Sequence, residues 1–174
     1  MRLFYALALP PWLAGIQAGM KERLGAQASW PRPEGLHLTL AFLGEQPEGM
    51  LPRLIQIGHG AAAQGTPFAL RTASLGTFPR AKVLWLGVEP EPALEALNAR
   101  LRGALGTGGV AFDAKPLRPH ITLGRLKAPL EVATLGADPE PRAFTVDHLT
   151  LFKSQTTPEG VVYEAVERFP LGRY

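Results

Sequence analysis

Apolar residues recur along the chain at two spacings, and each spacing predicts one type of element. Spacings of three and four residues mark one buried helical face, and they predict helices over 12–24, 50–63 and 94–105. Continuous or alternating apolar segments are typical of strands, and they occur over 3–10, 68–76, 83–90, 144–152 and 161–169. The segments 3–10 and 83–90 both end at a proline and both precede a helix, which indicates a repeat.

Two polar positions interrupt the apolar pattern in the same way in each half of the chain. The tetrapeptide His-Leu-Thr-Leu at 37–40 recurs as His-Ile-Thr-Leu at 120–123, 83 residues later. Because residues i and i+2 of a strand share a face, the histidine and threonine of each copy should point one way and the branched residues into a core. The similar flanking elements suggest a duplicated unit, which makes this motif pair more informative than either copy alone.

The order of elements predicts an α+β fold rather than a doubly wound parallel sheet. Short gaps between strands favour antiparallel pairing, so we expect antiparallel sheets flanking a central cleft, with helices on the outside. No linker, low-complexity tract or charge block divides the sequence. Residues 1–174 are therefore expected to form a single domain made of two pseudo-symmetric lobes.

Composition narrows the possible functions. The chain lacks cysteine, and it has 18 basic and 15 acidic residues for a net charge of +3, a bias compatible with an anionic ligand. Its three aspartates are far apart in sequence, which is a poor supply of carboxylates for a two-metal phosphodiesterase. No apolar segment is long enough to cross a membrane, and we find no signal peptide, so we expect a cytoplasmic protein with no membrane partner. A monomer is the default expectation.

The motif residues suit phosphoryl transfer. Histidine, with a usual pKa of about 6.5, can give or take a proton near neutrality. In-line displacement at phosphorus requires a base on one side and an acid on the other, and His37 and His120 supply one group each. The hydroxyls of Thr39 and Thr122 can donate to the non-bridging oxygens, where charge develops.

These motifs and their surroundings resemble the two-histidine phosphoesterase superfamily, in particular its bacterial and archaeal RNA 2′,3′-cyclic phosphodiesterases, long described as 2′-5′ RNA ligases. The resemblance covers nearly the whole chain, and it includes the segments 2–6, 37–44, 78–80, 118–123 and 149–154. It implies opening of a 2′,3′-cyclic phosphate at an RNA 3′ end to leave a 2′-phosphate, with no metal and no cofactor. Reversible 2′-5′ RNA ligation is implied as the same chemistry with an RNA 5′-hydroxyl in place of water. It also implies that His37 is the proton donor and His120 the acceptor, and that RNA ends or small cyclic nucleotides are the partners.

Two residues that follow the motifs leave alternatives open. Many relatives carry an arginine at the position of Arg125, which could bind phosphate bidentately. Strict alternation places Arg125 on the face opposite His120, so it reaches the site only if the strand twists or ends there; an ordinary surface arginine is the competing interpretation. Phe42 occupies the equivalent position after the first motif, and although it could stack on a base, we expect it to pack in the core.

Two other functions compete with a metal-independent hydrolase. A non-catalytic RNA- or nucleotide-binding module could use the same cleft, but binding alone would not require two proton carriers. A metalloprotein could use His37 and His120 as ligands, but a stable site needs three or four ligands, and the chain offers no cysteine and no nearby carboxylates.

Overall fold

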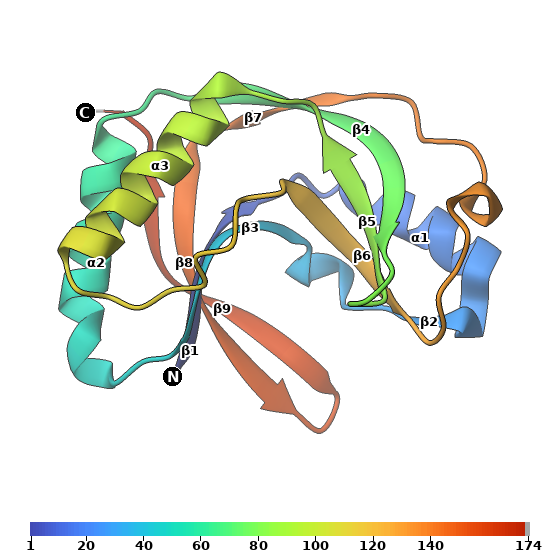
Figure 1. The fold of residues 1–174 in the computed structure, drawn as a ribbon, viewed down its shortest axis with the longest axis horizontal. Helices are drawn as coiled ribbons and strands as arrows, with labels where there is room; N and C mark the ends of the chain where they lie inside the picture. Colours follow the sequence, from blue (N-terminus) through green and yellow to red (C-terminus); the bar gives the residue numbers. More distant parts are fainter. Residues whose placement is uncertain (173–174) are drawn as a thin grey trace.

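Two antiparallel sheets carry the two motifs in a computed structural model that describes residues 1–172 (Figure 1). The first sheet has the strand order β3-β1-β8-β9 and the second has the order β2-β6-β5-β4-β7. The strands are β1 (Arg2–Ala8), β2 (Ala28–Ser29), β3 (His37–Glu45), β4 (Phe68–Phe78), β5 (Val83–Val88), β6 (His120–Leu126), β7 (Ala143–Val146), β8 (His148–Thr157) and β9 (Gly160–Pro170). The helices are α1 (Leu13–Leu24), α2 (Leu51–Ala63) and α3 (Pro92–Thr107). None of these helices is long and apolar enough to span a bilayer.

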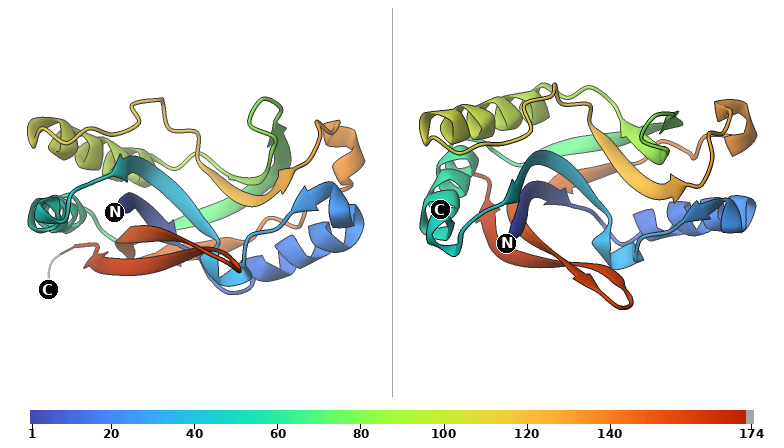
Figure 2. Two further views of the ribbon diagram at one scale, coloured as in Figure 1. Left: turned by 90° about the horizontal axis from the view of Figure 1, so that it is seen from below. Right: turned by 60° about the horizontal axis from the view of Figure 1, so that its bottom comes forward.

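The two halves of the sequence exchange elements between the sheets. Each motif strand pairs with the strand that opens its own half, β3 with β1 and β6 with β5. The strands that follow cross over, because β4 joins the second sheet whereas β8 and β9 join the first. The helices cross over too: α1 lies against the second sheet, and α3 lies beside α2 at the first (Figures 1 and 2). The two halves are thereby interlocked, and their apolar side chains form one buried cluster.

The predicted fold class is confirmed: the protein is α+β, with antiparallel sheets between outer helices (Figure 2). The helix predictions agree with the structure to within two residues at every end, and α3 is two residues longer at each end than predicted. The prediction of one strand over 144–152 is wrong. The chain breaks at Asp147, so that β7 pairs with β4 in the second sheet while β8 pairs with β1 in the first. A local apolar pattern cannot distinguish one long strand from two strands that belong to different sheets.

Gly58 is the position where α2 packs closely on β9. A side chain there would overlap the ring of Phe169, which is fully buried. Although alanine is the better helix former, we expect Gly58→Ala to lower the free energy of unfolding by about 1–3 kcal/mol, the usual cost of overpacking. Urea unfolding would measure it. Gly60 lies on the same helix with open space around its Cα, so Gly60→Ala should instead stabilise by about 0.5–1 kcal/mol. A stabilising Gly58→Ala would contradict this packing.

Candidate active site

The two motif histidines are held in the same way. His37 begins β3 and His120 begins β6. The Nδ1 of His37 lies 2.7 Å from the carbonyl oxygen of Gly35, and that of His120 lies 2.6 Å from the carbonyl oxygen of Arg118. Each ring is therefore bound to the carbonyl two residues before it. Because a carbonyl can only accept, Nδ1 carries the proton in both rings, and Nε2 is the nitrogen left to exchange a proton with a ligand.

The environment of His37 opposes its protonation. Burial lowers the pKa of His37, and its hydrogen bond to Gly35 raises the pKa in partial compensation. The charge of a protonated His120 lowers the pKa of His37 further. The two motif strands also contact each other. The topology thus brings together two imidazoles that are 83 residues apart in sequence.

The motif threonines share a face with the histidines, as the alternation predicts. Thr39 and Thr122 are half-buried, whereas the branched residues of both motifs are buried. In the sheets, Thr39 lies opposite Ala6 of β1, and Thr122 lies opposite Trp85 of β5. Each motif therefore presents one imidazole and one hydroxyl on the same side of its strand.

The β-bulge that directly follows the threonine in each motif strand corrects the prediction for the next residues; β3 has a second register shift later, at Leu43. In β3, Ala41 lies opposite Tyr5 and Thr39 lies opposite Ala6, so Leu40 has no counterpart in β1. In β6 the register skips Leu123 in the same manner. A bulge shifts the alternation by one residue.

The shift returns Arg125 and Phe42 to the faces of His120 and His37, and both are exposed. Strict alternation, which placed Arg125 on the opposite face, is wrong here, and so is the prediction that Phe42 packs in the core, because its side chain is 53% exposed. We call the six residues the two-motif face: His37, Thr39, Phe42, His120, Thr122 and Arg125.

Aromatic side chains from distant strands surround His37. The ring centroid of His37 lies 4.9 Å from that of Phe4 and 5.0 Å from that of Tyr163. Phe4 stacks in turn on Phe152 of β8, at 5.4 Å. His120 has one such neighbour, Phe78, at 5.0 Å. The local apolar pattern did not predict Phe152 and Tyr163 as neighbours of His37, because β8 and β9 join the first sheet only through the exchange of elements.

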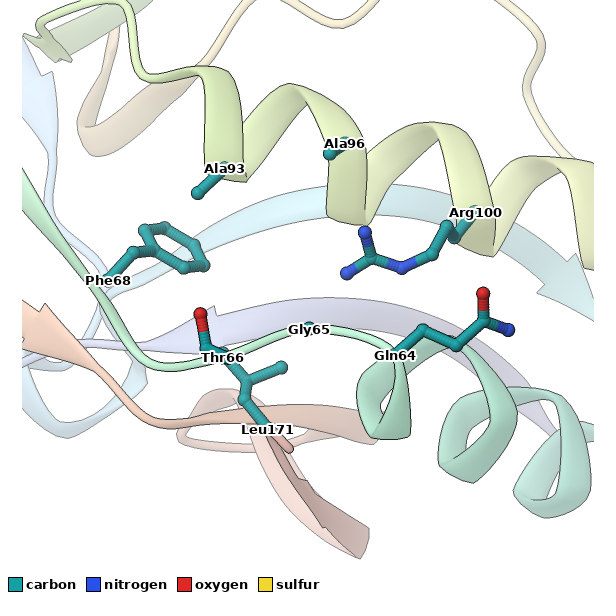
Figure 3. A pocket seen from close by; sticks show the side chains of 8 residues that line it. All are labelled: Gln64, Gly65, Thr66, Phe68, Ala93, Ala96, Arg100 and Leu171. Carbon is teal, nitrogen blue, oxygen red and sulfur yellow. The ribbon is translucent and has the colours of Figure 1, made fainter. Parts of the chain in front are cut away.

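Other potential sites lie apart from the two-motif face. Within residues 1–172, no three histidine, aspartate or glutamate side chains are placed so that they could hold a metal ion. Figure 3 shows a pocket between α2 and α3, into which the guanidinium of Arg100 points. None of the residues lining this pocket belongs to either motif. The motif histidines therefore remain the candidates for acid/base chemistry among the described residues.

Comparisons with known proteins agree with this geometry. Residues 10–158 match the family model of the 2′-5′ RNA ligase superfamily. The chain is 35% identical to the RNA 2′,3′-cyclic phosphodiesterase of Thermus thermophilus, over 98% of this chain and 90% of that protein. It is 30% identical to the Methanothermobacter thermautotrophicus protein of the same name, over 98% and 99%. A Thermus thermophilus crystal structure matches with a TM-score of 0.82 and 33% identity over the full length of both chains. Escherichia coli LigT complexed with 3′-AMP matches with a TM-score of 0.82 and 27% identity, over 99% and 98%.

Proposed function

The chain belongs to the 2′-5′ RNA ligase superfamily, and we propose that it opens the 2′,3′-cyclic phosphate at an RNA 3′ end to leave a 2′-phosphate. The observation that carries the proposal is the matched pair of histidines, each fixed through Nδ1 and each free to exchange a proton through Nε2. Relatives that align with nearly the whole chain are RNA 2′,3′-cyclic phosphodiesterases, and this supports the choice of substrate.

The reaction divides between the two imidazoles. His120 takes a proton from the attacking water as the new P–O bond forms, and His37 gives its proton to the 3′-oxygen as the P–O3′ bond breaks. The product is a 2′-phosphomonoester with a free 3′-hydroxyl, and the two rings have exchanged protonation states. Proton exchange with solvent restores them. No redox step and no external group are needed to balance this reaction.

The other residues of the two-motif face bind the substrate. The hydroxyls of Thr39 and Thr122 donate to the non-bridging oxygens, where negative charge develops in the transition state. The guanidinium of Arg125 pairs with the phosphate, and the exposed ring of Phe42 stacks on a base of the RNA end or of a small cyclic nucleotide. Since one chain supplies all six residues, we propose that it acts as a monomer, which light scattering would test.

Ligation is the same displacement with a different nucleophile. If an RNA 5′-hydroxyl replaces water, the product is a 2′-5′ linkage and the leaving group is unchanged. Water is abundant, so hydrolysis should dominate unless a second RNA end is held beside the phosphorus. A binding module without turnover would use the same face but would gain nothing from two free Nε2 atoms.

One incubation separates these functions. An oligoribonucleotide ending in a 2′,3′-cyclic phosphate is mixed with the protein, with and without EDTA, and the terminal phosphate is identified by ³¹P NMR. A 2′-phosphate formed equally in both samples is the expected result. Binding without turnover would identify a binding module, and loss of turnover with EDTA would identify a metal-dependent enzyme.

The lowered pKa of His37 sets the pH dependence of the reaction. A proton donor must be protonated in the free enzyme, so kcat/KM should fall as the pH rises through the pKa of His37, from a point below the usual value of 6.5. If His37 were instead the acceptor, kcat/KM would fall as the pH decreases through the same pKa. NMR titration of the His37 ring in the free protein gives the pKa to compare with the rate profile. Coincidence with the acidic limb would reverse the assigned roles.

A further inference from the structure

The two bulges are bound by side chains from helices of the opposite half. Gln17 of α1 donates its Nε2 hydrogens to the carbonyl oxygen of Leu123, the bulged residue of β6, at 3.0 Å, and to that of Pro31 at 2.9 Å. Arg102 of α3 donates Nη2–H to the carbonyl oxygen of Leu40, the bulged residue of β3, at 3.0 Å.

The second bond of each side chain follows the same plan. Pro31 lies in the loop before the first motif. Arg102 donates Nη1–H to the carbonyl oxygen of Lys115, in the loop before the second motif, at 2.6 Å. Each side chain thus ties the loop before its own half's motif to the bulge of the other half's motif. Helix α1 lies beside β6, and α3 lies at the first sheet (Figure 1). Two unlike residues thus make the same pair of contacts in the two halves.

Neither side chain is placed as an ordinary surface group. Gln17 is buried, with 3% of its surface exposed, and both N–H bonds of its amide are used on backbone carbonyls. The guanidinium of Arg102 also donates to the side-chain oxygen of Asn98 and lies over the ring of Phe112. Its acceptors are carbonyl oxygens, so its role is geometric rather than charge pairing.

We propose that Gln17 and Arg102 are positioning residues that hold the bulges and so aim Arg125 and Phe42 at the substrate. The bulge decides whether the residue two positions further on faces the histidine or the core. Gln17 therefore acts through Arg125, and Arg102 acts through Phe42. Trp30 packs beside the bulge of β6: a Cβ at Gly124, next to the bulge, would lie 2.9 Å from the Trp30 ring, so any larger residue there would force the ring to shift.

This inference rests on the proposed function for its activity readout, and a crossed set of double mutants tests it. Gln17→Met and Arg102→Met keep much of the side-chain volume and remove the donors. Each should lower kcat/KM by about 10- to 100-fold, the scale of a small misplacement of reacting groups. In an Arg125→Ala background, Gln17→Met should have less than about a twofold further effect, but in Phe42→Ala it should keep its full effect. Arg102→Met should show the opposite pattern.

If Gln17 and Arg102 only stabilised the fold, the outcome would differ. Gln17→Met and Arg102→Met would then each lower kcat/KM by the same factor in the Arg125→Ala and Phe42→Ala backgrounds, and that result would overturn the proposal. Arg102→Lys keeps a donor and should recover part of the activity. Arg100→Met is the matched control, since Arg100 lies on the same helix and donates to the carbonyl oxygen of Ala61, away from both motifs, so kcat/KM should be unchanged.

Amide hydrogen exchange tests the positioning role without an activity measurement. Gln17→Met should speed amide exchange in β6 around 123–126, and Arg102→Met should speed it in β3 around 40–43, while Arg100→Met should change neither. Unchanged amide exchange at both bulges refutes the positioning role. This readout does not depend on activity, so it holds even if the wild-type protein does not open the cyclic phosphate. If Gln17→Met does not fold, the Arg102 series applies the same criteria.

Discussion

His120→Ala is expected to lower kcat for opening the cyclic phosphate by about 10²- to 10⁴-fold, and His37→Ala by a similar factor, because each removes one of the two proton carriers. The double variant should be little worse than either single one, since the acid and the base act as a unit in the same transition state. Steady-state kinetics on a cyclic-phosphate oligoribonucleotide would measure all three variants.

The geometry of the histidines supplies a control that separates chemistry from folding. His120→Asn keeps an N–H that can donate to the carbonyl oxygen of Arg118, as Nδ1 does now, but it lacks Nε2. It should therefore fold like the wild type and be as inactive as the alanine variant. His59 is exposed on α2, outside the two-motif face, and His59→Ala should leave kcat unchanged. Substantial turnover by His120→Asn would show that His120 carries no proton in the reaction.

The sequence predicted the features that depend only on which residues of one element are buried. The helices and the shared face of each histidine and threonine follow from periodic burial, which a single strand or helix displays along its own length. No local sequence pattern indicates the exchange of elements between the sheets, because the exchange depends on which distant strand each segment pairs with. The apolar pattern therefore could not predict that Tyr163 and Phe152 lie beside His37 of the first motif.

The bulges were the one feature of the site that the sequence displayed and strict alternation overlooked. In both motif strands, two small or apolar residues follow the threonine in succession, Leu40-Ala41 and Leu123-Gly124, where a regular strand would alternate. A glycine inside a strand is itself a common mark of a bulge. The same signal in both halves was sufficient to place Phe42 and Arg125 beside the motifs. The side chains that hold the bulges lie in the opposite halves, beyond the reach of local patterns.

Thr39→Val and Thr122→Val are each expected to lower kcat by about 10²-fold with little change in KM, the usual cost of losing one donor to a developing negative charge. Valine keeps the shape of threonine, so the strands and their buried faces should be undisturbed. Thr→Ser at each position keeps the hydroxyl and should restore most of the rate. Stopped-flow or quenched-flow single turnovers would show whether the loss lies in the chemical step.

Thr150 provides the matched control for this substitution. It is a buried threonine of β8, and within residues 1–172 its hydroxyl has no hydrogen-bond partner. A buried hydroxyl without a partner costs free energy, so Thr150→Val should stabilise the protein by about 1 kcal/mol and leave kcat unchanged. If Thr39→Val and Thr122→Val also left kcat unchanged, the motif hydroxyls would be structural, and stabilisation of the phosphoryl oxygens would have to come from Arg125 alone.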